Sequence, residues 1–429
     1  MTNTASTLAS ACCAALFSLL GGNKVFLPGS AGYAASLGSY FSPQAASVLL
    51  LCIVAPQTVH DVSAAVRSMT AGSGGGGGGD HHHAGGSSSN RSLTVDLRAL
   101  NAINLNQDRS IVSVGVGATW DAVYRKLDPP RLSAVGGRAA GAGVGGLTLG
   151  GGISHLGPRF GFTYDTFTNF EVELADGSVV QVNGRDNPDL LWALRGGSNN
   201  FGVVTRVDLK AVDQGNFWGG VMLSPIETAS QQISEFVKIN SATQYDEYAA
   251  LIMSFGKPVV NPPVFQNLTK LPQFSSTLRV TNHTDLVVET RALQRDGMRQ
   301  ASAVLAIKST PAALSAAFAA WNASLPAVQN ITGLIWALVL EPLPPQIYAR
   351  HAAGTKGDAL VVTLLSMTWT LASDDAAVDR EAKALLAKIR AEATRLGAYH
   401  PFLYLNYAAP WQDPVASYGW DNVRRLRAV

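Results

Sequence analysis

The sequence predicts an α+β protein, and three observations lead to this prediction. Strand and helix patterns alternate too irregularly along the chain for a doubly wound parallel sheet. Glycine is concentrated in the first half, whereas the chain after about Gln214 carries long apolar strand patterns and amphipathic helices. The length of 429 residues, 47% of them hydrophobic, indicates two or three domains with a large buried interior.

Composition excludes several classes of function. Lys and Arg total 32 against 30 for Asp and Glu, and a net charge of +2 does not suit a nucleic-acid partner. No apolar run reaches the ~18–20 residues that a membrane-spanning helix needs. Forty-two glycines imply tight turns and close approach of another group to the backbone. We therefore expect an enzyme-sized protein built around a large ligand, with neither nucleic acid nor a membrane as partner.

The N-terminal region indicates the cellular compartment. Cys12, Cys13 and Cys52 are an odd number, so one disulfide to Cys52 is possible in an oxidising compartment, and buried free thiols are the alternative. No Lys or Arg precedes the apolar run 8–20, which we interpret as part of the fold, with any export signal absent from this chain. Five glycosylation sequons favour a secreted protein, and they begin at Asn90, Asn267, Asn282, Asn322 and Asn330.

Local patterns predict the elements of the first half. Residues 71–90 contain six consecutive glycines, then three consecutive histidines and three consecutive serines, which cannot bury enough apolar area to form more than a mobile loop. Residues 93–97 and 111–118 alternate like strands. Residues 119–127 place four apolar side chains on one helical face, with Thr119 as the capping residue.

Further local signals follow in the rest of the chain. Residues 170–182 predict a hairpin that turns at Asp176 and Gly177, and residues 187–196 predict a short helix with proline at its first position. In the second half, the strand candidates are residues 247–255, 334–343 and 359–369, the last long helix covers 373–397, and the aromatic, proline-containing tail is expected to be extended or looped.

The densest signal is the glycine-rich segment 136–152. Successive bare N–H groups form a concavity suited to a pyrophosphate. Gly141, Gly143 and Gly146 satisfy G-x-G-x-x-G, but the preceding residues form a poor strand and Asp165 sits in a loop-like segment. A Rossmann site is therefore disfavoured, and a structural glycine loop is the remaining alternative.

Several motifs in the same order resemble one family. They are GVGATWDAVYRKL (115–127), GVGGLTLGGGISHLGPRFGFTYDTFTNFEVELADGSVV (143–180), DLLWALRGGSNNFGVVTRVDL (189–209), YLNYA (404–408) and QDPVASYG (412–419). Together they resemble the FAD-linked oxidoreductases of the berberine bridge enzyme type, particularly the fungal members. The resemblance covers nearly the whole chain.

The resemblance implies a fold and a cofactor. It implies an FAD-binding domain of the p-cresol methylhydroxylase (PCMH) and vanillyl-alcohol oxidase type in residues 1–213, an inserted antiparallel-sheet substrate domain in 214–399, and a returning C-terminal segment in 400–429. The last of these stops short of the family's usual final segment. Residues implied to line the flavin and its pyrophosphate are Gly143, Gly145, Gly146, Leu149, Gly150, Gly151, Gly152, Ser154, Gly161, Asp165, Gly197, Asn200, Phe201, Gly202, Val203 and Asn406.

The resemblance also implies catalytic residues. Tyr404 and Tyr407 fall on the family's Y-x-N-Y motif, where a phenol can position a substrate hydroxyl and accept its proton as a hydride leaves for the flavin. A phenol with its usual pKa of ~10 is a poor base at neutral pH, so either tyrosine needs a neighbouring cation or hydrogen bond. Packing at a domain boundary is the alternative role.

The chain departs from the family at the covalent flavin links. No F-A-V-R-[SG]-G-G-H strand is present, and the glycine and histidine run stands in its place. His81 is the nominal candidate for the covalent link, with His82 and His83 as register alternatives, against solvated histidines or an incidental metal-binding tract. Ala139 occupies the position of the family's second, cysteine link. Attachment through two links is therefore impossible, and a covalent link of any kind is doubtful.

Three further residues have open roles. His155 follows the glycine loop and could reach the ligand or be a buried structural histidine. Glu341 and Trp369 lie on candidate strands of the inserted domain, where core or strand-end positions are favoured over contact with substrate. No metal site is expected.

The main functional hypothesis is an FAD-dependent oxidase of an alcohol, carbohydrate or secondary metabolite, with dioxygen as electron acceptor. One alternative is a degenerate member that binds FAD weakly or not at all. Another is a small-ligand-binding protein that keeps the scaffold without redox chemistry.

Overall fold

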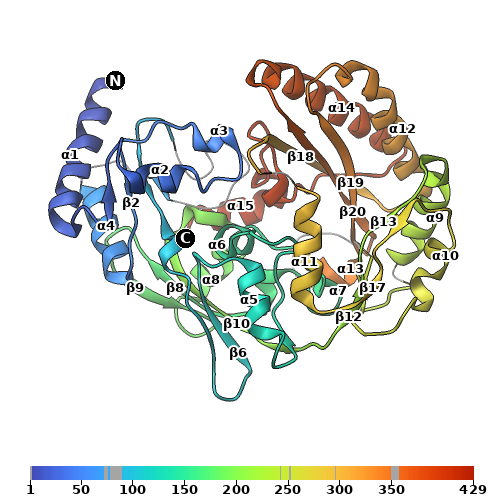
Figure 1. The fold of residues 1–429 in the computed structure, drawn as a ribbon, viewed down its shortest axis with the longest axis horizontal. Coiled ribbons are helices and arrows are strands. Elements are labelled where there is room, and N and C mark those ends of the chain that lie inside the picture. The colour runs from blue at the N-terminus through green and yellow to red at the C-terminus, as the bar shows by residue number, and fades with distance from the viewer. Residues whose placement is uncertain are drawn as a thin grey trace.

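The structure is a computed structural model, and it describes residues 2–71, 76–77, 89–241, 243–250, 253–294, 296–348 and 357–429. The N-terminal elements gather in one half of the molecule, and the long strands β18 to β20 with helices α12 and α14 form the other half (Figure 1). The C-terminal helix α15 (Trp420–Leu426) lies with the N-terminal half. His81, His82 and His83 lie outside the described residues.

A small sheet with two helices forms the N-terminal unit. Helices α1 (Thr2–Leu20) and α4 (Val59–Ala71) pack on this sheet, with Leu16, Val54 and Val66 among its buried side chains. The short helices α2 and α3 follow α1 (Figure 1). The strands, in spatial order, are β1 (Val25–Phe26), β2 (Cys52–Val54), β4 (Leu93–Val95) and β3 (Gly76–Gly77); α2 spans Ala31–Leu37 and α3 Pro43–Ala46.

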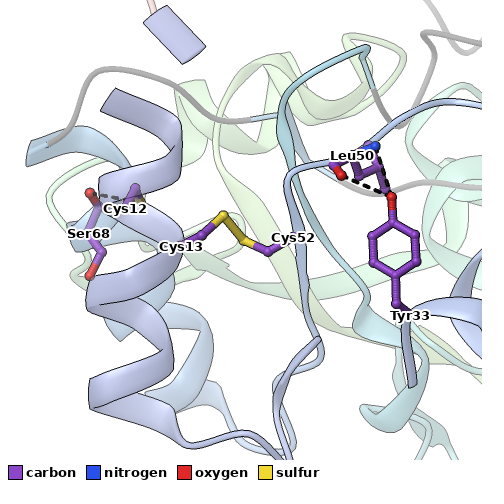
Figure 2. Close-up of a disulfide and its surroundings, with 6 residues drawn as sticks. All are labelled: Cys12, Cys13, Tyr33, Leu50, Cys52 and Ser68. Carbon is purple, nitrogen blue, oxygen red and sulfur yellow. Dashed lines mark hydrogen bonds between the residues drawn. A yellow bond between two sulfur atoms is a disulfide. The ribbon is translucent and has the colours of Figure 1, made fainter. Parts of the chain in front are cut away.

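A disulfide fastens helix α1 to this sheet. Cys13 and Cys52 are bonded, with their Cα atoms 6.0 Å apart, while Cys12 stays a buried free thiol whose Sγ lies 3.5 Å from the Ser68 carbonyl oxygen (Figure 2). The 8–20 run is therefore packed against the core, as expected from its pattern.

A five-stranded antiparallel sheet forms the centre of the first half. Its inner face packs on helices α5 (Trp120–Leu127), α6 (Val144–Leu149) and α8 (Pro188–Leu194). The predicted hairpin is confirmed, because β8 and β9 pair from Phe170↔Val182 to Glu173↔Val179. The strands, in spatial order, are β5 (Ile103–Leu105), β6 (Ile111–Gly115), β10 (Val203–Lys210), β8 (Phe167–Glu173) and β9 (Val179–Val182).

The second half is built on a sheet of long antiparallel strands, which agrees with the predicted α+β class. Helices α9, α12 and α14 pack on one side of it, and a smaller sheet lies beside it (Figure 1). The strands of the large sheet, in spatial order, are β19 (Ile335–Leu343), β20 (Leu360–Trp369), β18 (Arg299–Lys308) and β21 (Tyr399–His400). The helices are α9 (Ala229–Ile239), α12 (Pro311–Val328) and α14 (Asp375–Arg395). The strands of the smaller sheet, in spatial order, are β14 (Ala249–Ala250), β15 (Ser254–Phe255), β12 (Phe217–Gly219) and β17 (Arg279–Thr281).

Shorter elements connect these layers. Strands β7 and β11 pair with each other, as do β13 and β16. Their bounds, with the remaining helices, are β7 (Leu132–Ser133), β11 (Val212–Asp213), β13 (Met222–Leu223), β16 (Ser275–Ser276), α7 (Gly157–Phe160), α10 (Gln266–Thr269), α11 (His283–Ala292) and α13 (Pro345–Tyr348).

The structure corrects several local predictions. Residues 247–255 do not form one strand, because β14 and β15 pair with each other and the run folds back on itself. Within the predicted loop 71–90, Gly76 and Gly77 pair with β4. The tail is not wholly looped, since α15 is helical, and Thr119 makes no side-chain cap bond. No helix within the described ranges is long and apolar enough to cross a membrane.

Candidate functional site

The C-terminal tail closes directly on the glycine loop. Tyr404 is buried, and its phenol oxygen accepts the backbone N–H of Gly152 at 2.9 Å and that of Ile153 at 3.2 Å. Asn406 Nδ2 donates to the same oxygen at 3.0 Å and to the Leu147 carbonyl at 2.9 Å. Three N–H donors therefore surround the Tyr404 oxygen, which fixes residues 404–406 against the loop.

This contact explains why the loop needs three successive glycines. A Cβ on Gly150 would lie 1.9 Å from Asn406 Oδ1, and one on Gly151 would lie 2.8 Å from the Tyr404 ring. Gly152 has φ +82, and its Cβ would lie 2.1 Å from Thr163 Oγ1. The side chains of the tail and of Thr163 thus fill the space beside these glycines, which the sequence alone had assigned to the cofactor.

The first part of the glycine loop packs against other residues of the first half of the chain. Gly143 precedes helix α6, and a Cβ on Gly145 would lie 3.2 Å from Val116. Gly146 lies within α6, whose last residue, Leu149, accepts the Gly196 N–H at 3.0 Å. Ser154 is buried, and its Oγ accepts the N–H groups of Gly136 and Leu156.

Gly161 and Asp165 meet in one turn. Asp165 Oδ2 accepts the Phe162 N–H at 2.8 Å, and a Cβ on Gly161 would lie 2.3 Å from the same oxygen. Gly161, with φ +89, therefore makes room for a carboxylate that closes the turn after the loop.

The second stretch predicted to contact the cofactor, residues 197–203, begins beside the glycine loop and ends at the first residue of strand β10. Gly197 has no room for a Cβ beside the Ala193 carbonyl, and Asn200 Nδ2 donates to the Gly197 carbonyl at 2.7 Å. Phe201 packs on the core of the first half, and Val203 packs against the N-terminal unit. Gly202, with φ +134, lies between them. Tyr418 of the tail donates to the Gly196 carbonyl at 2.8 Å, so loop, stretch and tail meet.

A buried ion pair joins the loop to the second half. Arg138 Nη2 donates to Glu341 Oε1 at 2.6 Å and to the Tyr407 phenol oxygen at 3.0 Å, and the Tyr407 hydroxyl lies 3.2 Å from the same carboxylate oxygen. The side chains of Arg138 and Glu341 are 10% and 6% exposed. Tyr407 is partly exposed, whereas Tyr404 is buried.

The pKa values of Tyr404 and Tyr407 are shifted by different neighbouring groups. Burial raises the pKa of Tyr404 to about 12, although the bonds from Asn406 and Gly152 lower it. Burial, followed by repulsion from Glu341, raises the pKa of Tyr407, and Arg138 acts in the opposite direction. Burial alone would lower the pKa of Arg138, but Glu341 and Tyr407 outweigh it and raise that pKa. Tyr407 therefore keeps its proton at neutral pH, with a cation and a hydrogen-bond acceptor both beside its hydroxyl.

A cavity opens beside this cluster. It measures about 580 Å³ when the space open to solvent at its mouth is included. Arg138 lines it, as do Ile153 and Phe162 of the loop region and Leu343 and Ile347 from the second half. Its wall is mainly apolar, with Tyr245 and Asp246 among its polar members.

Sequence reasoning missed Arg138 and underrated Glu341. Glu341 is a lone charge in an otherwise apolar strand, and a buried carboxylate requires a partner, which was the available signal. Trp369 is a core residue, and its indole N–H donates to Asp375 at 2.8 Å. His155 is buried, and its Nδ1 lies 3.2 Å from His283 Nε2, so it has a structural partner.

The loop region has the features of a polar ligand site. Thr148 Oγ1 and Arg195 Nε are buried without a hydrogen-bond partner among the described residues, and both lie next to the Leu149–Gly196 contact. Buried polar atoms are normally paired, so unpaired ones at a loop fit a ligand that supplies the partner. The residues present therefore fit a phosphate-bearing cofactor such as FAD.

Fold and site together define a flavin-dependent oxidoreductase, and comparison with known proteins gives the family. Residues 50–183 match the family model of an FAD binding domain. An FAD-dependent monooxygenase of Cercospora beticola is 33% identical over 94% of this chain and 85% of its own length. Oligopeptidase PhomG' of Diaporthe leptostromiformis is 37% identical over 96% of this chain, which spans 35% of that protein. The chain belongs to this family of FAD-dependent oxidoreductases.

Solved structures agree in fold. 6-Hydroxy-D-nicotine oxidase from Arthrobacter nicotinovorans superposes with a TM-score of 0.78 at 20% identity, over 94% of this chain and 93% of that one. A variant of berberine bridge enzyme in complex with (S)-reticuline gives 0.72 at 15% identity, over 92% and 87%. The expected PCMH-type fold and berberine bridge resemblance are thereby confirmed, as is FAD as cofactor. The domain limits at 213 and 399 and the individual cofactor contacts stay predictions.

Proposed function

We propose that this chain is an FAD-dependent oxidase that removes a hydride from an alcohol, carbohydrate or secondary metabolite and passes the electrons to dioxygen. The Arg138–Glu341–Tyr407 cluster beside the cavity is the observation that carries this proposal. Bound FAD supplies the hydride acceptor.

The cluster suits removal of a hydroxyl proton. Tyr407 accepts the proton of the substrate O–H while its own phenol proton passes to Glu341, so no free phenolate has to form. Arg138 donates to both Tyr407 and Glu341 and holds them in position for this proton transfer. As the proton and the hydride leave, the alcohol becomes a carbonyl compound. The two electrons then reduce dioxygen to hydrogen peroxide.

Matched tyrosine variants test the proposal. Purified protein should show flavin absorbance, and anaerobic addition of alcohols, oligosaccharides or phenolic metabolites should bleach it for a true substrate. Tyr407→Phe should slow bleaching by about 10²–10⁴-fold. Tyr404→Phe should slow flavin reduction far less, because the Tyr404 hydroxyl binds the glycine loop and takes no part in the proton transfer. Unchanged flavin reduction in Tyr407→Phe would remove the base assignment, and protein that never takes up FAD would favour the degenerate ligand-binding alternative.

A monooxygenase is the second candidate, favoured by the name of the relative from Cercospora beticola. The two reactions differ in product. An oxidase releases one hydrogen peroxide per substrate oxidised, whereas a monooxygenase places one atom from labelled dioxygen into the product.

We also propose that the chain works in an oxidising compartment outside the cell. The Cys13–Cys52 disulfide supports this location, as do the exposed sequon residues Asn267, Asn322 and Asn330. Expression in a fungal host should yield the protein in the medium, carrying glycans that an endoglycosidase removes. Retention in the cell with reduced cysteines would contradict the proposal.

A further inference from the structure

One buried carboxyl group in the first half lacks a hydrogen-bond partner among the described residues. Glu173, the last residue of β8, is fully buried, and neither of its carboxyl oxygens has a hydrogen-bond partner among the described residues. Its neighbour Glu171, two residues earlier on the same face, is paired with Arg206 at 2.9 Å and accepts from Thr205 at 3.0 Å. An unpaired buried carboxyl is costly, and the fold has left this one unsatisfied.

The position of Glu173 in the sheet defines where it points. Phe170 and Val172 face the inner core of the first half, so Glu173 faces the opposite side of the sheet. Its Cα partner on β10 is Val203, which packs against the N-terminal unit. Helix α4 of that unit contacts β8 as well. Glu173 therefore lies between the N-terminal unit and the central sheet.

This is also where the second predicted cofactor stretch enters the sheet. Gly202 comes immediately before Val203, and a Cβ on it would lie 2.7 Å from the Glu173 carbonyl oxygen. The FAD-binding family model, residues 50–183, includes both α4 and Glu173. The unpaired carboxyl thus lies within the FAD-binding part of the chain, beside the glycine that admits close approach.

We propose that Glu173 binds the adenosine half of FAD, with its carboxyl group hydrogen-bonded to the adenine edge or to a ribose hydroxyl. Such a contact would satisfy the carboxyl oxygens that the protein itself leaves unpaired. It distinguishes an adenine dinucleotide from a flavin mononucleotide, which lacks this half. The proposal rests on FAD being the cofactor of this chain.

The protonation state of Glu173 agrees with this role. Burial, and then repulsion from Glu171, raises the pKa of Glu173 to about 8, against a smaller lowering by its own backbone and by the nearby Thr205 hydroxyl. At neutral pH the group is a carboxylic acid that can donate one hydrogen bond and accept another. Adenine offers the complementary pair, with an acceptor at N1 and a donor at N6.

Nucleotide titrations of the full chain, freed of flavin, test the proposal. For the wild type and for Glu173→Val, we would measure Kd for FAD and FMN by flavin fluorescence, and Kd for ADP and GDP by calorimetry. The variant should bind FAD and ADP at least about tenfold more weakly, the loss of one buried hydrogen bond, with unchanged Kd for FMN. If ADP and GDP bind the wild type equally, the contact is to ribose; if ADP binds better, it is to adenine.

Two controls keep the test decisive. Glu171→Gln removes the paired carboxyl on the same face and should change each Kd far less than Glu173→Val does, and the melting temperature of each variant without nucleotide shows that it is folded. Equal FAD and ADP affinity in folded Glu173→Val and wild type would overturn the proposal. Loss of FMN binding as well would overturn it too, because the effect would then not be confined to the adenosine half. Failure of the wild type to bind any flavin would instead argue against the proposed redox function.

Discussion

The phenol oxygen of Tyr404 accepts the N–H of Gly152 at 2.9 Å across 252 residues of sequence. The bond joins the C-terminal tail to the glycine loop, and the loop is free of side chains where the tail approaches it. One consequence is that the two ends of the predicted site share a single packing arrangement. A change in the loop should therefore displace the tail, including Tyr407.

A methyl group at Gly152 tests this coupling. The residue has φ +82, and an added Cβ would lie 2.1 Å from Thr163 Oγ1, so Gly152→Ala should destabilise the protein by roughly 2–4 kcal/mol through strain and overpacking. Denaturant unfolding measures the loss. Gly184→Ala is the control, since no atom lies within 4 Å of its Cβ, and it should stay within about 0.5 kcal/mol of wild type. Equal stability of the two variants would contradict the coupling.

The Arg138–Glu341 pair gives a second prediction. Arg138→Met leaves Glu341 as a buried carboxylate without its cation, which should cost about 3–5 kcal/mol and abolish most flavin reduction by substrate. The double variant Arg138→Met with Glu341→Leu should recover much of the stability, because no charge stays buried, but not the activity. Thermal unfolding and anaerobic flavin reduction measure the two effects. A double variant as unstable as Arg138→Met would show that the charge is not the cause.

Much of the first half could be predicted because its signals are local. Trp120, Tyr124 and Leu127 share a helical face and are buried in the structure, and the turn at Asp176 and Gly177 joins the predicted hairpin. Periodicity and turn chemistry determine such elements within a few residues. Where apolar residues run without a clear period, as in 247–255, the prediction failed, since a buried run does not show where it folds back.

The site itself could be predicted only in part. The Y-x-N-Y resemblance named Tyr404 and Tyr407, but the different roles that we assign to them depend on partners that are distant along the chain. Gly152 is 252 residues from Tyr404, and Glu341 and Arg138 are 66 and 269 residues from Tyr407. Which face of β19 carries Glu341 depends on the register with β20, which one sequence does not reveal. The glycines show the same limit: sequence indicates bare backbone, and only packing shows that Asn406 and Tyr404 occupy the space beside it.

The disulfide yields a third prediction. Cys13 and Cys52 are 39 residues apart, and a loop of this size corresponds to about 4 kcal/mol of stabilisation in the chain-entropy account. Cys52→Ser should lower the melting temperature, and dithiothreitol added to the wild type should lower it by about as much as this substitution does. Cys12→Ser should change it little and should keep its sensitivity to dithiothreitol, because Cys12 is the free thiol. A wild type insensitive to reductant would contradict a stabilising role.

The pKa of Glu173 gives the stability of the flavin-free protein a defined pH dependence. The folded chain holds this proton up to about pH 8, whereas the unfolded chain releases it near 4.5. Between these values the unfolded state binds fewer protons, so the free energy of unfolding should fall as pH rises from about 4.5 to 8 and level off above. Urea unfolding across this range measures the slope. Glu173→Gln should remove most of it, whereas Glu171→Gln should reduce it less, because only the repulsion that Glu171 adds to the effect of burial is lost. Equal slopes in wild type and Glu173→Gln would show that the folded protein holds Glu173 ionised.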